Sequence, residues 1–362
     1  MQLLKAMKIF FSNIEKETNI MKPDIAPAYS PLWKKLYSLI QNFIREKPWE
    51  LFENEDVFVV QSPRDNQMYL CCVLGNGGEE FGLNAFRGAQ GMRNFEKIIT
   101  NSFGQPDKNV IYEMDMLSIN LCTRDYMEKN DLKVTKKLML SFPGGKWPLI
   151  RSHKPHYFPW FLTEPEIETL CDCLEQILEL YHEGEDALDQ IRNVKPGEML
   201  VRHMENSSWV SHIVHVGYPA KEEIPEISLD DITIQRLRNL PATGLKEEID
   251  LVHFPGVIKD HEPHYFGLVL TGINEQQFAT QYGLFAPFHD YYQESCDKLI
   301  QNFLARGSKP SLVLLKKESP FADVFEIIAK QTDIKFKKCD ELPYISELID
   351  SVEEEMCDEE FY

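Results

Sequence analysis

The sequence lacks the long runs and short motifs that mark several large classes of protein. No stretch approaches the roughly 18 apolar residues of a membrane-spanning helix, and none carries the G-x-S-x-G motif of a serine nucleophile. The glycine-rich segment 75–82 lies between two predicted strands and lacks the lysine of a phosphate-binding loop, so a hairpin turn is expected there. The eight cysteines form no C-x-x-C pair, which argues against a zinc ribbon or disulfide scaffold and favours reduced thiols in the cytoplasm.

Basic residues are also scarce. Lysine and arginine total 38 against 58 acidic residues, which gives a net charge of -20 and a field that repels nucleic-acid phosphates. The best basic clusters, Lys136–Lys137 and Lys335–Lys338, are small. Nucleic acid is therefore not an expected partner, and neither is a membrane.

A chain of 362 residues with 43% hydrophobic residues has the length and apolar content of two globular domains. The composition changes near Lys195–Gly197, where proline and glycine mark a break. The predicted organisation is a disordered extension at 1–28, an α+β domain at 29–195, an α/β domain at 196–352 and an acidic tail at 353–362. Whether Met1 or Met21 begins the protein stays open at this stage.

The first domain is predicted to be an antiparallel meander with packed helices. Apolar residues recur at helical spacing over residues 31–46, and short strand-like runs separated by turn residues follow. Thr163 and Glu166 form a capping box before the helix over 164–181. The expected elements are helices at 31–46, 88–100 and 164–181 and strands at 56–61, 68–74 and 81–86.

The second domain is predicted to begin with a hairpin over 199–217 that turns around Glu205–Ser207. Strands are expected at 251–254 and 265–270, while residues 232–239 fit either a helix or a strand. The last hundred residues alternate between helix and strand, which implies parallel strands joined by right-handed crossovers. These alternating elements are expected at 290–304, 311–315, 320–331, 334–339 and 343–352.

Histidine pairs are the first candidates for a ligand or metal site. The spacing His-x-x-His occurs at His153/His156, His212/His215 and His261/His264. Proline separates the members of the first and third pairs, so these are not helical, and strand residues three apart face opposite sides. A zinc site would also need a third ligand, gathered by the fold from His203, His253 or Glu262. Ordinary hydrogen-bonded histidines are the favoured interpretation.

The sequence H-x-P-H-Y-F occurs twice, at 153–158 and 261–266, and whether it marks two duplicated domains stays open. The aromatic segment 156–160 either lines a groove or seals a core, and the core is favoured. One candidate ligand or metal cluster follows from these patterns: His153, His156, Tyr157, Trp160, Trp209, His261 and His264. No catalytic residue, cofactor or definite metal ligand is assigned.

Residues 53–95 resemble the first domain of a group of uncharacterised bacterial two-domain proteins. The matching residues are Asp56, Phe58, Val60, Pro63, Tyr69, Cys71, Cys72, Gly75, Gly78, Glu79, Phe81 and Leu83. Residues 147–166 are similar to the close of that domain, and residues 309–351 resemble the second domain. The resemblance implies a 7309-like domain of unknown function followed by a 6930-like one, with no activity or catalytic residue to carry over.

The expected element order of the second domain is also that of a ribonuclease-H-like domain: three strands, a helix, a strand, a helix and a strand. Such enzymes hold two metals with carboxylates on the first strand and near the end of the fourth. The strand at 265–270 carries no carboxylate, and Glu318 alone lies near the later strand. The second domain is therefore predicted to be catalytically bare.

These observations favour a soluble, cytoplasmic protein that acts as a non-catalytic binding or interaction module for an unknown protein or small molecule. One alternative is a metal-dependent hydrolase or nuclease that uses the histidine pairs. Another is a small-ligand sensor with a site between the two domains, lined by Tyr157, Trp160 and Trp209. Metal content would separate the hydrolase from the other two.

Overall fold

The chain folds as two α/β units. The computed structural model describes residues 31–101, 109–216 and 225–359. The N-terminal unit contains the described residues up to 216 except His156–Phe158, and the C-terminal unit contains residues 225–359 together with His156–Phe158. The extension expected at 1–28 lies outside the described residues.

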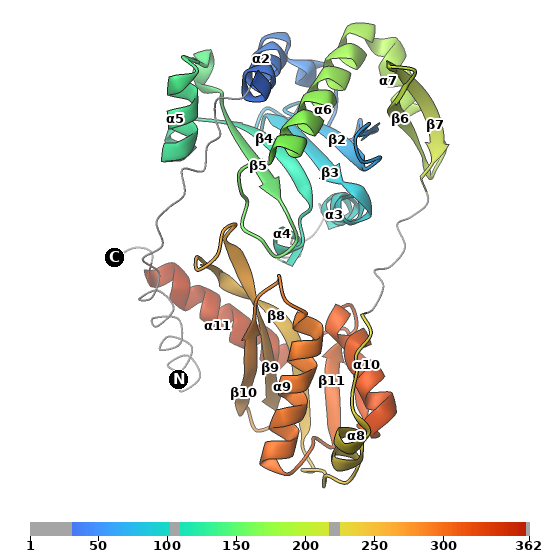
Figure 1. The fold of residues 1–362 in the computed structure, drawn as a ribbon, viewed down its shortest axis with the longest axis vertical. Helices are drawn as coiled ribbons and strands as arrows, with labels where there is room; N and C mark the ends of the chain where they lie inside the picture. The colour runs from blue at the N-terminus through green and yellow to red at the C-terminus, as the bar shows by residue number, and fades with distance from the viewer. Residues whose placement is uncertain (1–30, 102–108, 217–224, 360–362) are drawn as a thin grey trace. The chain divides into compact units, whose positions relative to one another are not determined.

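A seven-stranded sheet in the order β5-β4-β3-β2-β1-β6-β7 organises the N-terminal unit (Figure 1). Strands β1 to β5 run antiparallel to their neighbours, which confirms the predicted meander, and β6 runs parallel to β1. The strands are β1 (Phe58–Gln61), β2 (Met68–Leu74), β3 (Gly82–Arg87), β4 (Met116–Cys122), β5 (Trp147–His153), β6 (Glu198–Glu205) and β7 (Ser208–His215). The helices are α2 (Pro31–Glu46), α3 (Gly88–Asn101), α4 (Asn109–Tyr112), α5 (Lys129–Lys137), α6 (Glu164–Glu183) and α7 (Glu185–Arg192), with short 3-10 turns at Pro48–Glu50, Arg124–Tyr126 and Pro143–Gly145.

Helices cover both faces of this sheet (Figure 1). On one face, α2 and α6 bury side chains such as Leu36 and Leu174 in the larger core. On the other face, Phe95 of α3 packs against Phe86 of β3, with ring centroids 5.3 Å apart. The adjacent Cys71 and Cys72 point into these two different cores, as strand alternation predicts.

The capping box predicted at the start of α6 is present. The backbone N–H and the hydroxyl of Thr163 both donate to Glu166 Oε2, at 2.8 and 2.9 Å. Because Thr163→Ala removes the capping hydroxyl, we expect the free energy of unfolding to fall by about 1 kcal/mol. Urea titration followed by tryptophan fluorescence measures this change. Thr163→Ser should retain wild-type stability, and an equal loss in both variants would contradict the capping role.

The hairpin β6–β7 belongs to the N-terminal sheet, whereas the sequence analysis placed it at the start of the second domain. Strand β6 pairs in parallel with β1, with Val201 opposite Val59, and Arg202 donates to Gln176 of α6 at 2.8 Å. The break at Lys195–Gly197 therefore connects two parts of one unit. A parallel partner so far back along the chain leaves no local sequence signal, so the break was mistaken for a boundary.

A five-stranded sheet in the order β10-β9-β8-β11-β12 organises the C-terminal unit. Strands β8, β9 and β10 are antiparallel, while β11 is parallel to β8 and β12 is parallel to β11, which confirms the predicted parallel strands. The order of elements is the one expected of a ribonuclease-H-like domain. The elements are α8 (Asp231–Arg238), β8 (Lys246–Ile258), β9 (Tyr265–Asn274), β10 (Ala279–Phe285), α9 (Tyr291–Arg306), β11 (Leu312–Lys316), α10 (Pro320–Thr332), β12 (Phe336–Cys339) and α11 (Pro343–Glu359).

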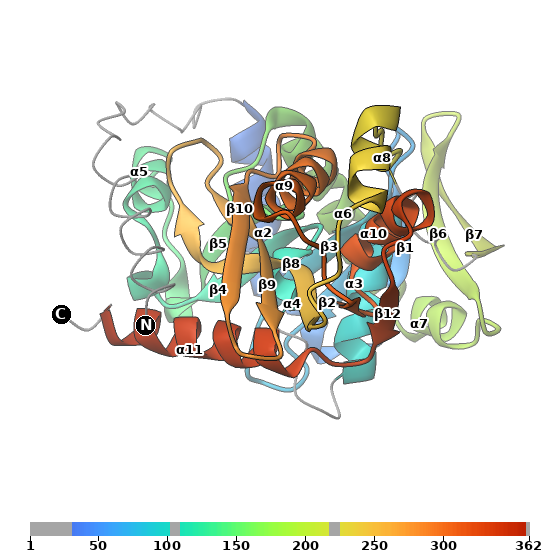
Figure 2. The same ribbon diagram turned by 90° about the horizontal axis from the view of Figure 1, so that it is seen from below.

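The two faces of the C-terminal sheet have different covers. Helices α9 and α10 bury Phe303 and Phe325 against one face, together with Ile249 of β8. Helix α11 covers the other face, where Val352 packs near Val269 (Figure 2). Because β8 lies in the middle of this sheet, its side chains are enclosed on both faces, including the polar ones. Helix α11 continues to Glu359, so much of the segment expected as an acidic tail is helical.

Among the described helices, none combines the length and the apolar character needed to cross a bilayer. The described cysteines are free thiols. Burial raises the pKa of the Cys72 and Cys296 thiols to about 12. Both thiols therefore stay protonated at neutral pH and are poor nucleophiles.

Candidate functional site

Three buried carboxylates follow one another on β8, the first strand of the C-terminal sheet. Glu247, Glu248 and Asp250 are each 5% exposed or less. The expectation of no carboxylate concerned the strand at 265–270, and the strand before it was expected to begin at Leu251, whereas β8 begins at Lys246. Two adjacent glutamates are typical of a solvated loop, so they did not suggest a strand. The signal that could have extended the strand to include them is the alternation of apolar residues that continues from Leu251 toward the N-terminus.

Glu247 faces α9 and belongs to a closed polar network. The Tyr282 hydroxyl donates to Glu247 Oε1, and Arg306 Nη2 donates to Oε2 at 3.0 Å. The Arg306 guanidinium also lies over the Phe303 ring, 4.6 Å from its centroid. Burial, followed by the charge of Glu247, raises the pKa of the Tyr282 phenol, which keeps the hydroxyl proton available for this bond. Both carboxylate oxygens of Glu247 thus have internal partners.

Glu248 and Asp250 face the opposite side of the sheet from Glu247. Glu248 Oε2 accepts the backbone N–H of Ile345 at 3.0 Å, and so caps the first turn of α11. Asp250 Oδ1 accepts the Ser319 hydroxyl at 2.6 Å and the backbone N–H of Leu251 at 2.9 Å. Burial raises the pKa of Asp250 to about 6, against the lowering effects of these bonds and of the Lys316 charge.

The donor set of β8 does not fit the pair of metals that ribonuclease-H-like enzymes hold. A two-metal site needs carboxylate oxygens that converge and are open to the ions. Glu247 is on the wrong face, Glu248 caps a helix, and the partner supplied after β11 is the Ser319 hydroxyl in place of a carboxylate. Glu318, the acid expected near this strand, is exposed. Each of the three acids thus accepts at least one hydrogen bond from within the protein.

Three residues of the predicted ligand cluster lie in the N-terminal unit. His153 Nε2 lies 3.0 Å from Ser118 Oγ, and burial, followed by the charges of Arg151 and Arg87, lowers its pKa to about 4. Trp160 exchanges two backbone hydrogen bonds with Ser152, at 2.8 and 2.9 Å. Trp209 lies on β7 and packs against the larger core. The contacts given for these three residues are with different partners.

The other four predicted residues belong to the C-terminal unit. His156 Nδ1 lies 2.8 Å from His253 Nε2. His261 stacks on Phe288 with centroids 4.6 Å apart, and His264 Nδ1 lies 3.0 Å from the carbonyl oxygen of His261. Within the part of the chain that the structure describes, neither of the histidine pairs His153/His156 and His261/His264 belongs to a group of three side chains that could hold one metal ion. His253, considered as a third ligand in the sequence analysis, meets the imidazole of His156.

The two H-x-P-H-Y-F segments pair with each other. Tyr157 and Tyr265 form an antiparallel bridge, flanked by hydrogen bonds from Phe158 N to the His264 carbonyl and from Phe266 N to the His156 carbonyl, at 3.0 and 2.8 Å. The first segment follows β5, whereas the second leads into β9, the strand next to β8. The repeated sequence therefore marks two segments that meet within the C-terminal unit.

A third histidine group, which the sequence analysis did not assemble, lies on the β6–β7 hairpin. His203 and Glu205 of β6 meet His212 of β7. The predicted pair His212/His215 diverges, as its spacing of three along a strand requires. The turn at 206–207 fixes the register of the hairpin, which pairs His203 with Val210 and Val201 with His212. Working out this register from the sequence would have shown that His203 and His212 lie close together.

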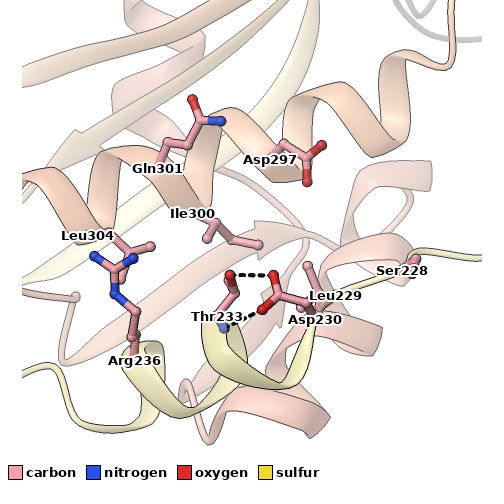
Figure 3. A pocket seen from close by; sticks show the side chains of 9 residues that line it. All are labelled: Ser228, Leu229, Asp230, Thr233, Arg236, Asp297, Ile300, Gln301 and Leu304. Carbon is pink, nitrogen blue, oxygen red and sulfur yellow. Dashed lines mark hydrogen bonds between the residues drawn. The ribbon is translucent and has the colours of Figure 1, made fainter.

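A pocket of about 320 Å³ lies between α8 and α9 in the C-terminal unit (Figure 3). Arg236 lies at one end beside Leu304, while Asp297 and Asp230 lie toward the other end (Figure 3). Asp230 accepts from the backbone N–H and the hydroxyl of Thr233, at 2.9 and 2.6 Å, and so caps α8. The pocket is lined by Ser228, Leu229, Asp230, Thr233, Arg236, Asp297, Ile300, Gln301 and Leu304.

The pocket leaves some polar groups available to a ligand. Asp297 Oδ1 accepts from Gln293 at 2.9 Å, which leaves its second oxygen available. The side chains of Arg236 and Gln301 make no hydrogen bond or ion pair with the residues that the structure describes. The pocket thus offers a cation at one end, carboxylates at the other and an apolar wall of Ile300 and Leu304 between them.

Comparison with known families finds one domain in each of the two units of the fold. Residues 33–202 match the model of a domain of unknown function, DUF7309, and residues 233–353 match that of a second, DUF6930. The first match ends within β6, and the second runs from α8 into α11. Comparison with the curated proteins and with the solved structures gives no match.

Proposed function

We propose that this protein is a non-catalytic module that binds a small zwitterionic ligand. The proposal is argued from geometry, because the DUF7309 and DUF6930 domains that the chain joins have no assigned function. The observation that carries the non-catalytic part is the engagement of all three β8 carboxylates by internal donors. Carboxylates that serve as helix caps and hydrogen-bond acceptors are not free to hold the metals or protons of a hydrolytic reaction.

The α8–α9 pocket supports the binding part of this proposal. Its volume is close to the lower end of the range typical of small-molecule sites, about 300–1,000 Å³. A ligand with one anionic and one cationic group, such as an amino acid, matches Arg236 at one end and Asp297 at the other. Ile300 and Leu304 would cover its apolar part. The proposed site shares no residue with the small-ligand site considered in the sequence analysis, which was lined by Tyr157, Trp160 and Trp209.

A metal-dependent hydrolase that uses the histidine pairs has less support. Among the residues that carried this alternative, His153 lies beside Ser118, His156 meets His253, and His261 stacks on an aromatic ring. None of these three contacts leaves two imidazoles and an acid around one ion. His212, a member of the remaining pair, is the exception, because it meets His203 and Glu205. The hydrolase also lacks an accessible carboxylate on β8, because each one is buried.

Binding is tested on the full chain by calorimetric titration with each of the twenty standard amino acids. We expect at least one to bind, and Arg236→Ala to weaken its affinity at least tenfold by removing the partner of its carboxylate. The matched control is Arg238→Ala on the same helix, because Arg238 donates to the Gln331 carbonyl outside the pocket. Absence of binding, or equal weakening by both substitutions, would rule out this ligand class or this pocket.

Catalysis is tested separately with Mg²⁺ and Mn²⁺ on single-stranded DNA, RNA and a chromogenic phosphodiester. We expect no turnover above a protein-free control. Turnover that disappears in Asp250→Asn would overturn the non-catalytic part of the proposal, whatever the result of the amino-acid titrations.

A further inference from the structure

The β6–β7 hairpin gathers three metal-ligating side chains on one face. Side chains two apart along a strand share a face, so His203 and Glu205 point the same way from β6. His212 lies opposite Val201 in the antiparallel register, which places it on this face too, diagonally across from His203. Among the described residues, His203, Glu205 and His212 are the group of three whose ligand atoms all lie within 4.8 Å of one another.

The distances within this group are close to those of a metal site. The Nε2 atoms of His203 and His212 lie 2.9 and 3.7 Å from the same oxygen, Glu205 Oε1. Ligand atoms about 2.1 Å from a tetrahedral Zn²⁺ are roughly 3.4 Å apart, so the two distances bracket the required one. The imidazole centroids are 4.8 Å apart. Small side-chain rotations would let all three atoms reach one ion.

The hairpin holds these side chains on a fixed backbone. Asn206 and Ser207 both have positive φ, 48° and 65°, as in the two-residue turn that sets the register of a tight hairpin. Arg202, whose side chain points away from the histidines, donates to Gln176 of α6 and to Ser211 of β7, at 2.8 and 2.9 Å. One buried arginine thus ties both strands to the unit, and a preorganised backbone favours ligand binding.

The chemistry of the three donors selects a class of ion. Two imidazoles and one carboxylate suit Zn²⁺ and its neighbours in the transition series, whereas Ca²⁺ and Mg²⁺ prefer oxygen ligands alone. Three protein ligands leave a fourth tetrahedral place for water or for an outside group. Glu205 and His212 have side chains that are 53% and 52% exposed, so that place is open to solvent.

We propose that His203, Glu205 and His212 form a site for a single Zn²⁺ ion, with two imidazole nitrogens, one carboxylate oxygen and an exchangeable fourth ligand. The site is independent of the α8–α9 pocket and of the proposed amino-acid binding, because it lies in the other unit. An ion here would join β6 to the edge strand β7 through side chains, in addition to the hydrogen bonds between them.

The test uses the full chain, stripped of metal with a chelator, dialysed and titrated with Zn²⁺ by calorimetry. We expect one ion per chain, and His203→Ala and His212→Ala should each weaken binding by about 100-fold or more, since each removes one of three ligands. Co²⁺ in place of Zn²⁺ should give the visible absorption of a four-coordinate site, and each substitution should abolish it.

His215→Ala is the matched control, because His215 lies on the same strand but faces the other way from His212. It should bind Zn²⁺ as the wild type does. Circular dichroism checks that the three variants fold alike, which matters most for His203→Ala because the His203 side chain is 23% exposed. No binding by the wild type, retention in both His203→Ala and His212→Ala, or an equal loss in His215→Ala would overturn the proposal.

Discussion

Arg151→Met is expected to lower the free energy of unfolding of the N-terminal unit by about 3–5 kcal/mol. Arg151 is 5% exposed and makes a two-point contact with Asp131, with N···O distances of 2.9 and 2.8 Å. It also donates to Glu128 at 2.8 Å, while its guanidinium lies over the Phe161 ring. Methionine fills most of the arginine volume but leaves the Asp131 carboxylate, itself 7% exposed, without a counter-charge.

The loss of stability in Arg151→Met should depend on the unpaired charge of the Asp131 carboxylate. Asp131→Asn combined with Arg151→Met removes both charges, so the double variant should be more stable than Arg151→Met alone. Urea unfolding followed by tryptophan fluorescence reports on this unit, because all five tryptophans lie between residues 33 and 209. Arg45→Met is the control for an exposed pair: Arg45 reaches Glu46 at 3.2 Å with 68% of its side chain exposed, and should change stability by less than about 1 kcal/mol. A loss below about 1 kcal/mol in Arg151→Met would contradict this account.

Elements whose signal is local could be predicted from the sequence. The start of α6 was found because Thr163, Pro165 and Glu166 stand in the order that a helix N-terminus requires. The last helices and strands followed from apolar runs that change period from 3.6 to 2. In each case the residues that determine the structure are within one turn or one strand of each other.

Features that depend on distant partners were missed. Nothing near Val201 indicates that β6 pairs with β1, and nothing near Asp250 indicates that Ser319 will meet it across the sheet. The metal ligands show the same limit. His203 and His212 stand nine residues apart, and their proximity depends on the hairpin register, which the sequence analysis did not work out.

Asp250→Asn is expected to stabilise the C-terminal unit at neutral pH and to change its pH dependence. The pKa of Asp250 is about 6 in the folded protein, above its ordinary value of 3.8, because burial disfavours the carboxylate. The folded state therefore holds a proton between about pH 4 and 6 that the unfolded state has released. Stability falls as pH rises through this window, because the native state binds more protons than the unfolded state does. Above about pH 6 the carboxyl is ionised in both states, so its titration no longer changes the stability.

Asparagine has no proton to lose, so its advantage over the wild type should grow from pH 4 to pH 7 by up to about 3 kcal/mol. Urea titrations by circular dichroism report both units, and tryptophan fluorescence of the same samples separates the N-terminal one. Asp340→Asn, at a side chain that is 89% exposed, should show no such growth. A constant difference between Asp250→Asn and the wild type across this range would contradict the argument.

Ser319→Ala tests the same carboxylate from its partner's side. The Ser319 hydroxyl donates to Asp250 at 2.6 Å and lowers the pKa of the buried acid, although burial outweighs it. Without this donor the pKa should rise further, so the stability of Ser319→Ala should continue to fall above pH 6, where that of the wild type levels out. If Asp250 needs the Ser319 hydroxyl in order to ionise near neutral pH, its carboxylate serves as a structural acceptor of hydrogen bonds. That role is the one on which the non-catalytic proposal for this unit depends.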